Sequence, residues 1–312
     1  MIRDLRRSDS PFLFDLMTRD FPEESALMGN RPEGFQRIVK RVFRWDTRLI
    51  LGLLRLIGRR VVRILVVEAD GKMVAMTMVT FPPVSAYVSS VVVDQPYRRR
   101  GYAKQMLEEA RRTAKSAHRK YVALDVLAHN TSARALYESI GYRALRTKTH
   151  YVHESPGQFG TTPPTNASIR PFRRADVGPL LAIARRQTPA TVESILPTGA
   201  ARFAISNFEN SMLASEQVAW VIDRGRGPEA HVSATVSLAF DAAHLSPPVL
   251  AESVEPELAG ALVRTAGSWV AAHRAPRILS VVSEENVQGQ AALVAAGFQR
   301  ALESSTLYRP VD

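Results

Sequence analysis

The stretch VVVDQPYRRRGYAKQML (91–107) joins an apolar run to an amphipathic pattern through three arginines and a glycine. The run before it is typical of a buried strand, and the apolar residues after Gly101 recur at helical spacing. The first turn of a helix has unpaired amides and about half a positive charge, so it attracts anions. Gly101 leaves room for a ligand there, and Arg98, Arg99 and Arg100 add charged donors. The junction predicts a pyrophosphate site, although the same residues also fit a solvated turn.

The composition narrows the class of protein. The chain has 312 residues, 46% of them hydrophobic and 23% charged, which is typical of about two globular domains. It has no cysteine, which excludes disulfides, thiolate metal sites and a thioester on the enzyme. The start lacks an apolar signal-peptide core, and the most apolar stretch, 49–67, carries four arginines. We therefore expect no membrane span and a cytoplasmic location.

The net charge of +11 lies almost entirely in one part of the chain. Residues 1–155 hold 28 Lys and Arg against 16 Asp and Glu, and the remaining residues hold 13 against 14. Any anionic partner is therefore expected to meet the first half.

An internal repeat predicts two copies of one α/β domain. IRDLRRSD (2–9) recurs as IRPFRRAD (169–176), and Asn130 and Asn286 each precede a glycine, Gly141 or Gly297, by eleven positions. Residues 153–168 are rich in Pro, Gly, Ser and Thr and fit a linker. The predicted domains are 1–152 and 169–312, each with a mixed, mostly antiparallel sheet flanked by helices.

The expected elements of the first copy follow from periodicity and turn residues. Asp70-Gly71 predicts a hairpin of two strands over 61–68 and 73–81, since this pair adopts the positive φ of a tight turn. Further strands are expected over 86–93 and 121–128. Helices are expected to start near 12 and after Gly101 and Asn130, and to cover 35–43, with a left-handed cap at Gly141.

In this context the sequence resembles the GNAT family of acyl-CoA-dependent N-acetyltransferases. VVVDQPYRRRGYAKQML resembles the family's motif A, and NTSARALYESIGY (130–142) resembles the segment after its fifth strand. The resemblance covers nearly all of residues 1–150 in element order. One departure is Gln95, where the family often has proline.

The resemblance implies a cofactor site and a proton donor. Backbone amides of Arg99, Arg100, Gly101, Tyr102, Ala103 and Lys104 would cradle the pyrophosphate of acetyl-CoA, with Arg98 fixing the loop. The strand ending at Val92 and Val93 would splay from its neighbour and pair with the pantetheine amide, and the Val93 amide would stabilise the oxyanion. Asn130 would hydrogen-bond near the pantetheine arm. Tyr137 would protonate the leaving thiolate.

Some of these residues have simpler roles on pattern alone. Tyr137 lies at helical spacing with apolar residues, as a core aromatic would, and Asn130 fits a helix N-cap. For the general base, Asp125 or His129 could relay a proton through water, but each also fits a strand-edge or surface position. Glu23 and Glu24 could instead bind a substrate ammonium.

A basic stripe in the first half offers another binding surface. Arg37, Arg41, Arg44 and Arg48 would share one face of a helix over 35–48, either as a solvated face or as a dock for an acidic acceptor, anionic membrane or nucleic acid. Of these partners, we favour nucleic acid least.

The second half repeats the expected elements but not the chemical motifs. VEPELAGA (254–261) has no arginine and places Glu255 and Glu257 at a helix start, where they would repel phosphate. Leu293 stands where the first half has Tyr137. We therefore expect a degenerate second domain, at most covering a sheet edge or walling the acceptor site.

The sequence favours an acetyl-CoA-dependent N-acetyltransferase that transfers acetyl directly in a ternary complex without a metal. The acceptor would be a small-molecule amine or a peptide N-terminus, and the chain a pseudo-dimeric monomer or a homodimer. The alternative is an inactive GNAT pair whose basic half binds nucleic acid or an acidic partner.

Overall fold

The computed structural model describes residues 1–9, 12, 16, 19, 62–162, 166–203, 215–237 and 240–312. Phe12, Leu16 and Arg19 are helical, as expected near the first predicted helix. The helix predicted over 35–43, the basic stripe and the Glu23–Glu24 site lie outside the described residues.

In the described part of the first half, the predicted hairpin, the two further predicted strands and the predicted helices after Gly101 and Asn130 follow one another in the predicted order, and strands β1 (Ile2–Asp4) and β6 (Arg143–His153) are added to them. Its elements are β1 (Ile2–Asp4), η1 (Arg7–Asp9), β2 (Val62–Ala69), β3 (Lys72–Thr80), β4 (Ser85–Val93), η2 (Gln95–Tyr97), α5 (Tyr102–Ser116), β5 (Tyr121–Leu127), α6 (Thr131–Ser139), β6 (Arg143–His153) and η3 (Pro156–Phe159). Asp70 and Gly71 turn the hairpin with φ of 51° and 73°, and Gly141 follows α6 with φ of 92°. Both glycine-dependent turns were predictable from sequence.

The second half repeats this order. Its elements are β7 (Ile169–Pro171), η4 (Arg174–Asp176), α7 (Val177–Gln187), α8 (Ala190–Ile195), η5 (Ala200–Phe203), β8 (Ser215–Asp223), β9 (Pro228–Ser237), β10 (Ala243–Leu245), β11 (Val249–Leu250), α10 (Pro256–Ala272), β12 (Ile278–Ser283), α11 (Val287–Ala295) and β13 (Gln299–Pro310). The described strands form one mixed sheet in the order β1-β2-β3-β4-β5-β13-β6-β12-β10-β9-β8-β7, with β11 beside β9.

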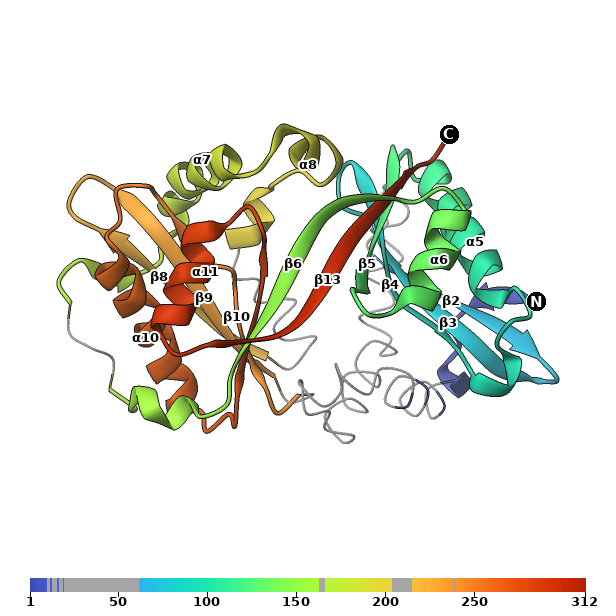
Figure 1. The fold of residues 1–312 in the computed structure, drawn as a ribbon, viewed down its shortest axis with the longest axis horizontal. Helices are drawn as coiled ribbons and strands as arrows, with labels where there is room; N and C mark the ends of the chain where they lie inside the picture. The colour runs from blue at the N-terminus through green and yellow to red at the C-terminus, as the bar shows by residue number, and fades with distance from the viewer. Residues whose placement is uncertain are drawn as a thin grey trace.

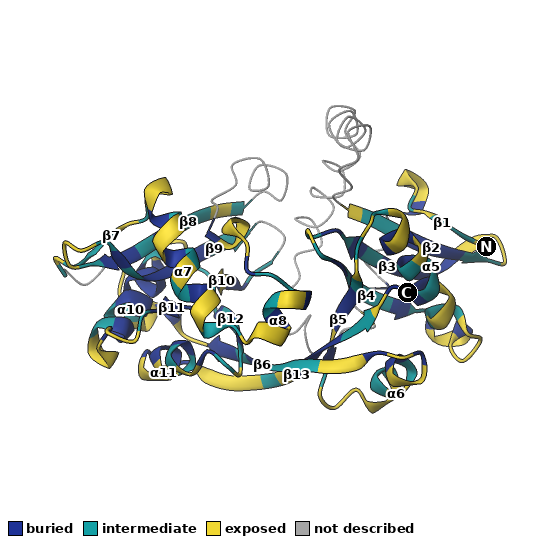
Figure 2. Ribbon diagram, turned by 90° about the horizontal axis from the view of Figure 1, so that it is seen from above, coloured by how far each residue is buried: buried dark blue, intermediate teal, exposed yellow. Residues whose placement is uncertain are grey.

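The two halves exchange their last strands. β13, from the end of the chain, pairs antiparallel with β5 of the first half, and β6 pairs antiparallel with β12 of the second half. β13 and β6 also pair with each other, and Figure 1 shows them side by side between the two halves. Figure 2 shows the same two strands joining the halves in the perpendicular view. The domain limits of 1–152 and 169–312 remain a prediction, and the exchange means that the last strand of each range pairs with strands of the other range.

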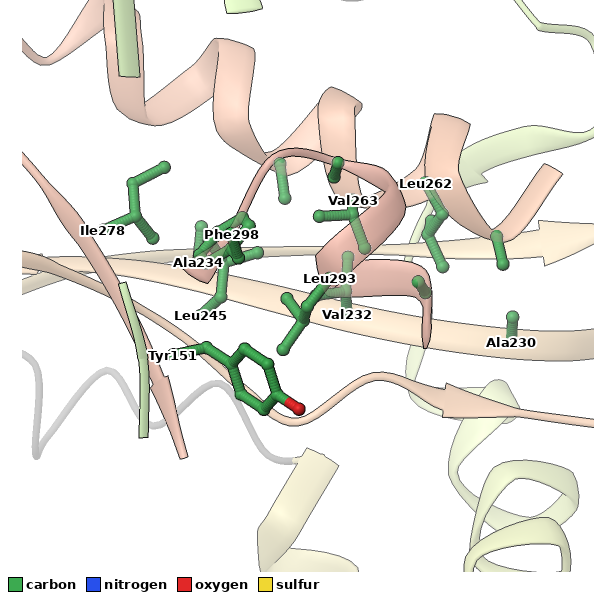
Figure 3. Close-up of a cluster of buried hydrophobic side chains, with 14 of the residues drawn as sticks. Tyr151, Ala230, Val232, Ala234, Leu245, Leu262, Val263, Ile278, Leu293 and Phe298 are labelled. Atoms are coloured by element: carbon green, nitrogen blue, oxygen red, sulfur yellow. The ribbon is translucent and has the colours of Figure 1, made fainter. Parts of the chain in front are cut away.

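The exchanged strands contribute to the cores of the opposite halves. Tyr151 on β6 is fully buried in the core of the second half, beside Leu293 and Val232 (Figure 3). Its hydroxyl donates to Oε1 of Gln290 at 3.0 Å. In return, Leu307 on β13 is buried in the core under α5 and α6 of the first half. Because each apolar side chain that leaves water stabilises the fold by about 1.5–3 kcal/mol, the exchange ties the stability of both halves together.

The repeated IRxxRRxD motif forms the same ionic clasp in both halves. Arg3 makes two hydrogen bonds to Asp9, at 2.7 and 2.9 Å, and Arg170 makes two to Asp176, both at 2.8 Å. Hydrogen bonds from these arginines lower the pKa of both aspartates. The motif is therefore accounted for by folding alone and requires no ligand.

No helix in the described part of the chain is long and apolar enough to cross a membrane.

Candidate functional site

The loop between β4 and α5 presents an uncapped helix start behind three arginines. Gly101 precedes α5 with φ of 79°, and no side chain caps the helix. The amides of its first turn therefore have neither an intrahelical carbonyl nor a capping side chain as partner. Arg99, also in the left-handed region with φ of 63°, helps turn this loop. Such a concave run of amides suits a phosphate or pyrophosphate.

The neighbouring arginines hold the loop in shape. Nε of Arg98 donates to the carbonyl oxygen of Val93 at 3.0 Å, which ties the loop to the end of β4. Arg100 donates to the carbonyl of Pro96 at 3.2 Å and lies 5.1 Å from the centre of the Tyr97 ring. Tyr102 and Ala103 are half-buried, whereas Gly101, Lys104 and the three arginines are exposed. The exposed charges remain within reach of an anion at the helix start.

Strands β4 and β5 separate next to this loop. Their parallel pairing runs from Ser85–Tyr121 to Val88–Leu124 and stops there. Ser90 has φ of 54°, and the β3–β4 register shifts between Met76 and Met78, which marks a bulge. Beyond it, Val92 and Val93 still pair with β3 but not with β5. We call this divergence the fork; an extended ligand arm could enter it and pair with the free edge of β4.

Helix α6 begins on the other side of the fork. Oδ1 of Asn130 accepts a hydrogen bond from the Ala133 amide at 3.1 Å, so Asn130 is an N-cap, one of the two roles considered for it. Tyr137, further along α6, is only 6% exposed and packs among apolar side chains. Burial raises the pKa of Tyr137 to about 12, so it is protonated at neutral pH. The Tyr137 hydroxyl forms no hydrogen bond with a described residue and is not fully buried. It is therefore available to a ligand.

A polar cluster lies where β4 and β5 begin to separate. Asp125 accepts from Nζ of Lys148 at 2.7 Å and from the hydroxyl of Thr306 at 2.6 Å. Lys148 in turn approaches the Tyr87 hydroxyl at 3.4 Å. Burial alone would raise the pKa of Asp125, but the Lys148 ammonium outweighs this effect and lowers it. For Lys148, burial outweighs the attraction of the Asp125 carboxylate, so the pKa of Lys148 is lowered. An ionised, paired carboxylate is a good counter-ion and a weak base.

Tyr87, Lys148 and Thr306 were not predicted from the sequence as members of this site. Lys148 and Thr306 lie on the two exchanged strands, and Thr306 is 181 residues from Asp125. No local pattern signals such a contact. The other candidate base, His129, is exposed just beyond β5 and next to Asn130.

The second half has a fork of its own, but its loop differs from the one that precedes α5. β10 pairs with β12 in parallel, whereas β11 pairs only with β9. At the start of α10, Glu255 takes the N-cap position and forms an ion pair with Arg224 at 2.9 Å. Leu293 is fully buried in the apolar core (Figure 3). These features would disfavour phosphate at α10 and offer no proton donor at the position of Tyr137.

The described residues contain no cluster of His, Asp and Glu that could hold a metal ion.

Comparison with known proteins supports the relation suggested by the motifs. Residues 12–142 match the model of the acetyltransferase (GNAT) family. A segment of 62 residues is 39% identical to a Bacillus subtilis (strain 168) protein named "Uncharacterized N-acetyltransferase YycN". The match covers 20% of this chain and 40% of that protein, so it spans less than half of the relative.

Solved structures resemble the whole chain. A protein described as "Tandem GNAT protein from the clavulanic acid biosynthesis pathway (without AcCoA)" is 17% identical, with a TM-score of 0.66 over 100% of this chain and 98% of that one. A GCN5-related N-acetyltransferase from Sphaerobacter thermophilus is 16% identical, with a TM-score of 0.62 over 100% and 95%. A putative acetyltransferase from Pyrococcus horikoshii is 11% identical, with a TM-score of 0.61 over 99% and 89%.

At these identities the structural likeness shows a shared fold, and the match to the family model lies within the first half. The chain has the fold of these tandem GNAT structures, and its residues 12–142 are similar to the acetyltransferase (GNAT) family.

Proposed function

We propose that the first half is an acetyl-CoA-dependent N-acetyltransferase that acts on a primary amine by direct transfer in a ternary complex. The observation that carries this proposal is the adjacency of the uncapped start of α5 to the fork between β4 and β5. Acetyl-CoA combines a pyrophosphate with an extended pantetheine arm, and these two features match the two parts of the site. The acyl donor supplies an activated thioester.

The residues of the loop and the fork would hold the donor. The amides of Arg99 to Lys104 would bind the pyrophosphate, and Arg98 would keep that loop on the end of β4. Val92 and Val93 would pair with the arm, and the Val93 amide would stabilise developing negative charge. Asn130, as the cap of α6, would line the opposite side.

Proton movements would use groups on both sides of the fork. Tyr137, whose pKa is raised to about 12, would donate a proton to the departing thiolate. Asp125 and His129 are the proposed proton acceptors for the amine, acting through water. If Asp125 is the base, the acidic limb of kcat/KM should lie below about pH 4, because the pKa of Asp125 is lowered from 3.8.

Calorimetric titration with acetyl-CoA tests the first part of the proposal. We expect one site per chain, because the start of α10 is occupied by the ion pair between Glu255 and Arg224. Two sites would show that the second half also binds the donor. Absence of binding would refute the enzyme and favour a basic binding module, for which steeply salt-dependent binding of nucleic acid is the matching assay.

Amine-dependent release of free coenzyme A tests the second part. A panel of small amines and short peptides with free N-termini would be incubated with acetyl-CoA and the protein. Thiol release that requires both the amine and an intact Gly101 would support direct N-acetylation. Asp125→Asn and His129→Gln, compared over pH, would then identify the proton acceptor.

A further inference from the structure

A cavity of about 750 Å³ lies between the two halves, away from the loop that precedes α5. Tyr87, Arg146 and Lys148 line it from the first half of the chain. Its other walls come from the second half, including Arg202 on η5 and Glu285 after β12. The volume falls in the range of small-molecule binding sites, about 300–1,000 Å³.

The cavity extends from Tyr87 and Lys148, in the polar cluster of the first half, to the second half's counterpart of the fork. Ser283 ends β12, and Asn286, which caps α11, also lines the cavity. A second hollow of about 530 Å³ shares Glu285 and Asn286 with it and reaches Ala251, next to β11. The acidic start of α10 argues against coenzyme A here. The space in the second half that corresponds to the place of the pantetheine arm is therefore open to another ligand.

The cavity lining has more basic side chains than the described carboxylates can pair with. Arg146 pairs with Glu285 at 3.0 Å, and Lys148 pairs with Asp125. Arg185, also in the lining, lies 3.5 Å from Glu193. Arg202 forms no ion pair with any residue that the structure describes. Among the described residues, the Arg202 guanidinium is therefore left without a counter-ion in this cavity.

Two further observations indicate that Glu285 alone does not satisfy Arg146 and Arg202. Nε of Arg146 is fully buried and has no hydrogen-bond partner among the described residues. Desolvation and the charge of Arg146 lower the pKa of Arg202, while Glu285 opposes them. Guanidinium groups prefer paired, charge-assisted contacts with carboxylate or phosphate, so an anion here would relieve both defects.

We propose that this cavity is a second ligand site, in which Arg202 and Arg146 bind a small molecule through its carboxylate or phosphate groups. The site is separate from the donor loop and does not depend on the N-acetyltransferase proposal. The second half would then have a binding role of its own at a fork that no longer suits coenzyme A.

Calorimetric titration at low ionic strength tests the proposal, with succinate, inorganic phosphate and the neutral analogue succinamide as probes. We expect succinate or phosphate to bind once per chain and succinamide not to bind. The better of the two anions identifies the preferred group. Arg202→Gln should weaken binding at least tenfold, and Arg202→Lys should weaken it less because the charge is kept.

Two control variants distinguish this cavity from a general effect of surface charge and from the donor loop. Arg226→Gln removes the same charge from the exposed β8–β9 turn and should leave anion binding unchanged. Gly101→Glu alters the donor loop and should also leave it unchanged. The proposal is wrong if neither anion binds, if Arg202→Gln binds as the unmodified protein does, or if only Gly101→Glu abolishes binding. Acetyl-CoA titration of each variant reports on the N-acetyltransferase proposal separately.

Discussion

The carboxylate of Asp125 on β5 and the ammonium of Lys148 on β6 are 2.7 Å apart, although β13 lies between their strands. Thr306, on that intervening strand, donates a hydrogen bond to the same carboxylate. The last strand of the chain therefore completes the polar cluster at the fork of the first half. A substitution at any of these three residues should affect the stability of both halves.

Asp125→Asn should lower the free energy of unfolding by about 1–2 kcal/mol, because it leaves the ammonium of Lys148 without its counter-ion in a partly buried place. A carboxylate whose pKa is lower in the folded protein stabilises it above the unfolded pKa, and this contribution is lost as pH falls through the folded value. The difference between the two proteins should therefore shrink below about pH 4. Urea unfolding at pH 7 and at pH 3.5 measures it. A difference that is the same at both pH values would contradict the ionised pair.

Gly101→Glu should abolish acetyl-CoA binding, since it adds a negative charge where the pyrophosphate would lie. Gly101→Ala should cost about 1 kcal/mol of stability, because φ is 79° there, and should weaken binding less. Gly71→Ala is the matched control: its φ is 73° and an added Cβ would contact nothing. It should lose similar stability and bind acetyl-CoA normally. Equal binding losses in both alanine variants would mean that strain, and not the loop, is responsible.

Tyr137→Phe should spare acetyl-CoA binding and lower turnover about 10²-fold, in line with loss of a general acid. Stability should change little, because the hydroxyl bonds no described residue. Calorimetry, steady-state kinetics over pH and thermal unfolding separate these effects. Unchanged turnover and pH profile would leave Tyr137 as a core aromatic only.

His231 should make stability depend on pH between about 4 and 6.5. It is 1% exposed, its Nε2 has no partner among the described residues, and burial lowers its pKa to about 4. The unfolded chain binds the proton first, so stability should fall by up to about 3 kcal/mol as pH drops through this window. His231→Phe, which keeps the edge contacts to Phe172 and Phe203, should flatten that slope. An unchanged slope in chemical denaturation would exclude His231 as its source.

A chain without residues 299–312 should fail to fold stably, because β13 pairs with both β5 and β6. Exposed strand edges of this kind also promote aggregation. By contrast, a protease site inserted at the exposed residues 160–162 should give two fragments that stay together on gel filtration. Fragments that separate and remain folded would show that the exchange is not needed for stability.

The sequence could predict those features that depend on local chemistry. Asp70-Gly71 and Gly141 have the predicted positive φ, and Asn130 caps its helix as an asparagine before an amphipathic run should. The Arg and Asp of the repeated motif are only six residues apart, so one short sequence motif contains both partners of the ion pair. Each of these features is specified within a few residues.

The remainder depends on which strands meet, and short patterns do not specify that. β6 and β13 have similar alternation and could each have completed their own half. Their exchange, and with it the contact of Lys148 and Thr306 with Asp125, is decided by packing of residues such as Tyr151 in the opposite core. The bulge at Ser90 was also missed, because serine rarely adopts a φ of 54° and gives no signal for it.

The strand exchange also bears on how such a protein can change over time. Two subunits that swap their final strands and are then fused end to end would have this strand order. After fusion, the second copy can lose the arginines and the tyrosine of its own site without harm to the first. It cannot be deleted, because the first copy would lose the strand beside β5. Selection for the fold of one copy therefore preserves the other, whatever ligand that other copy comes to bind.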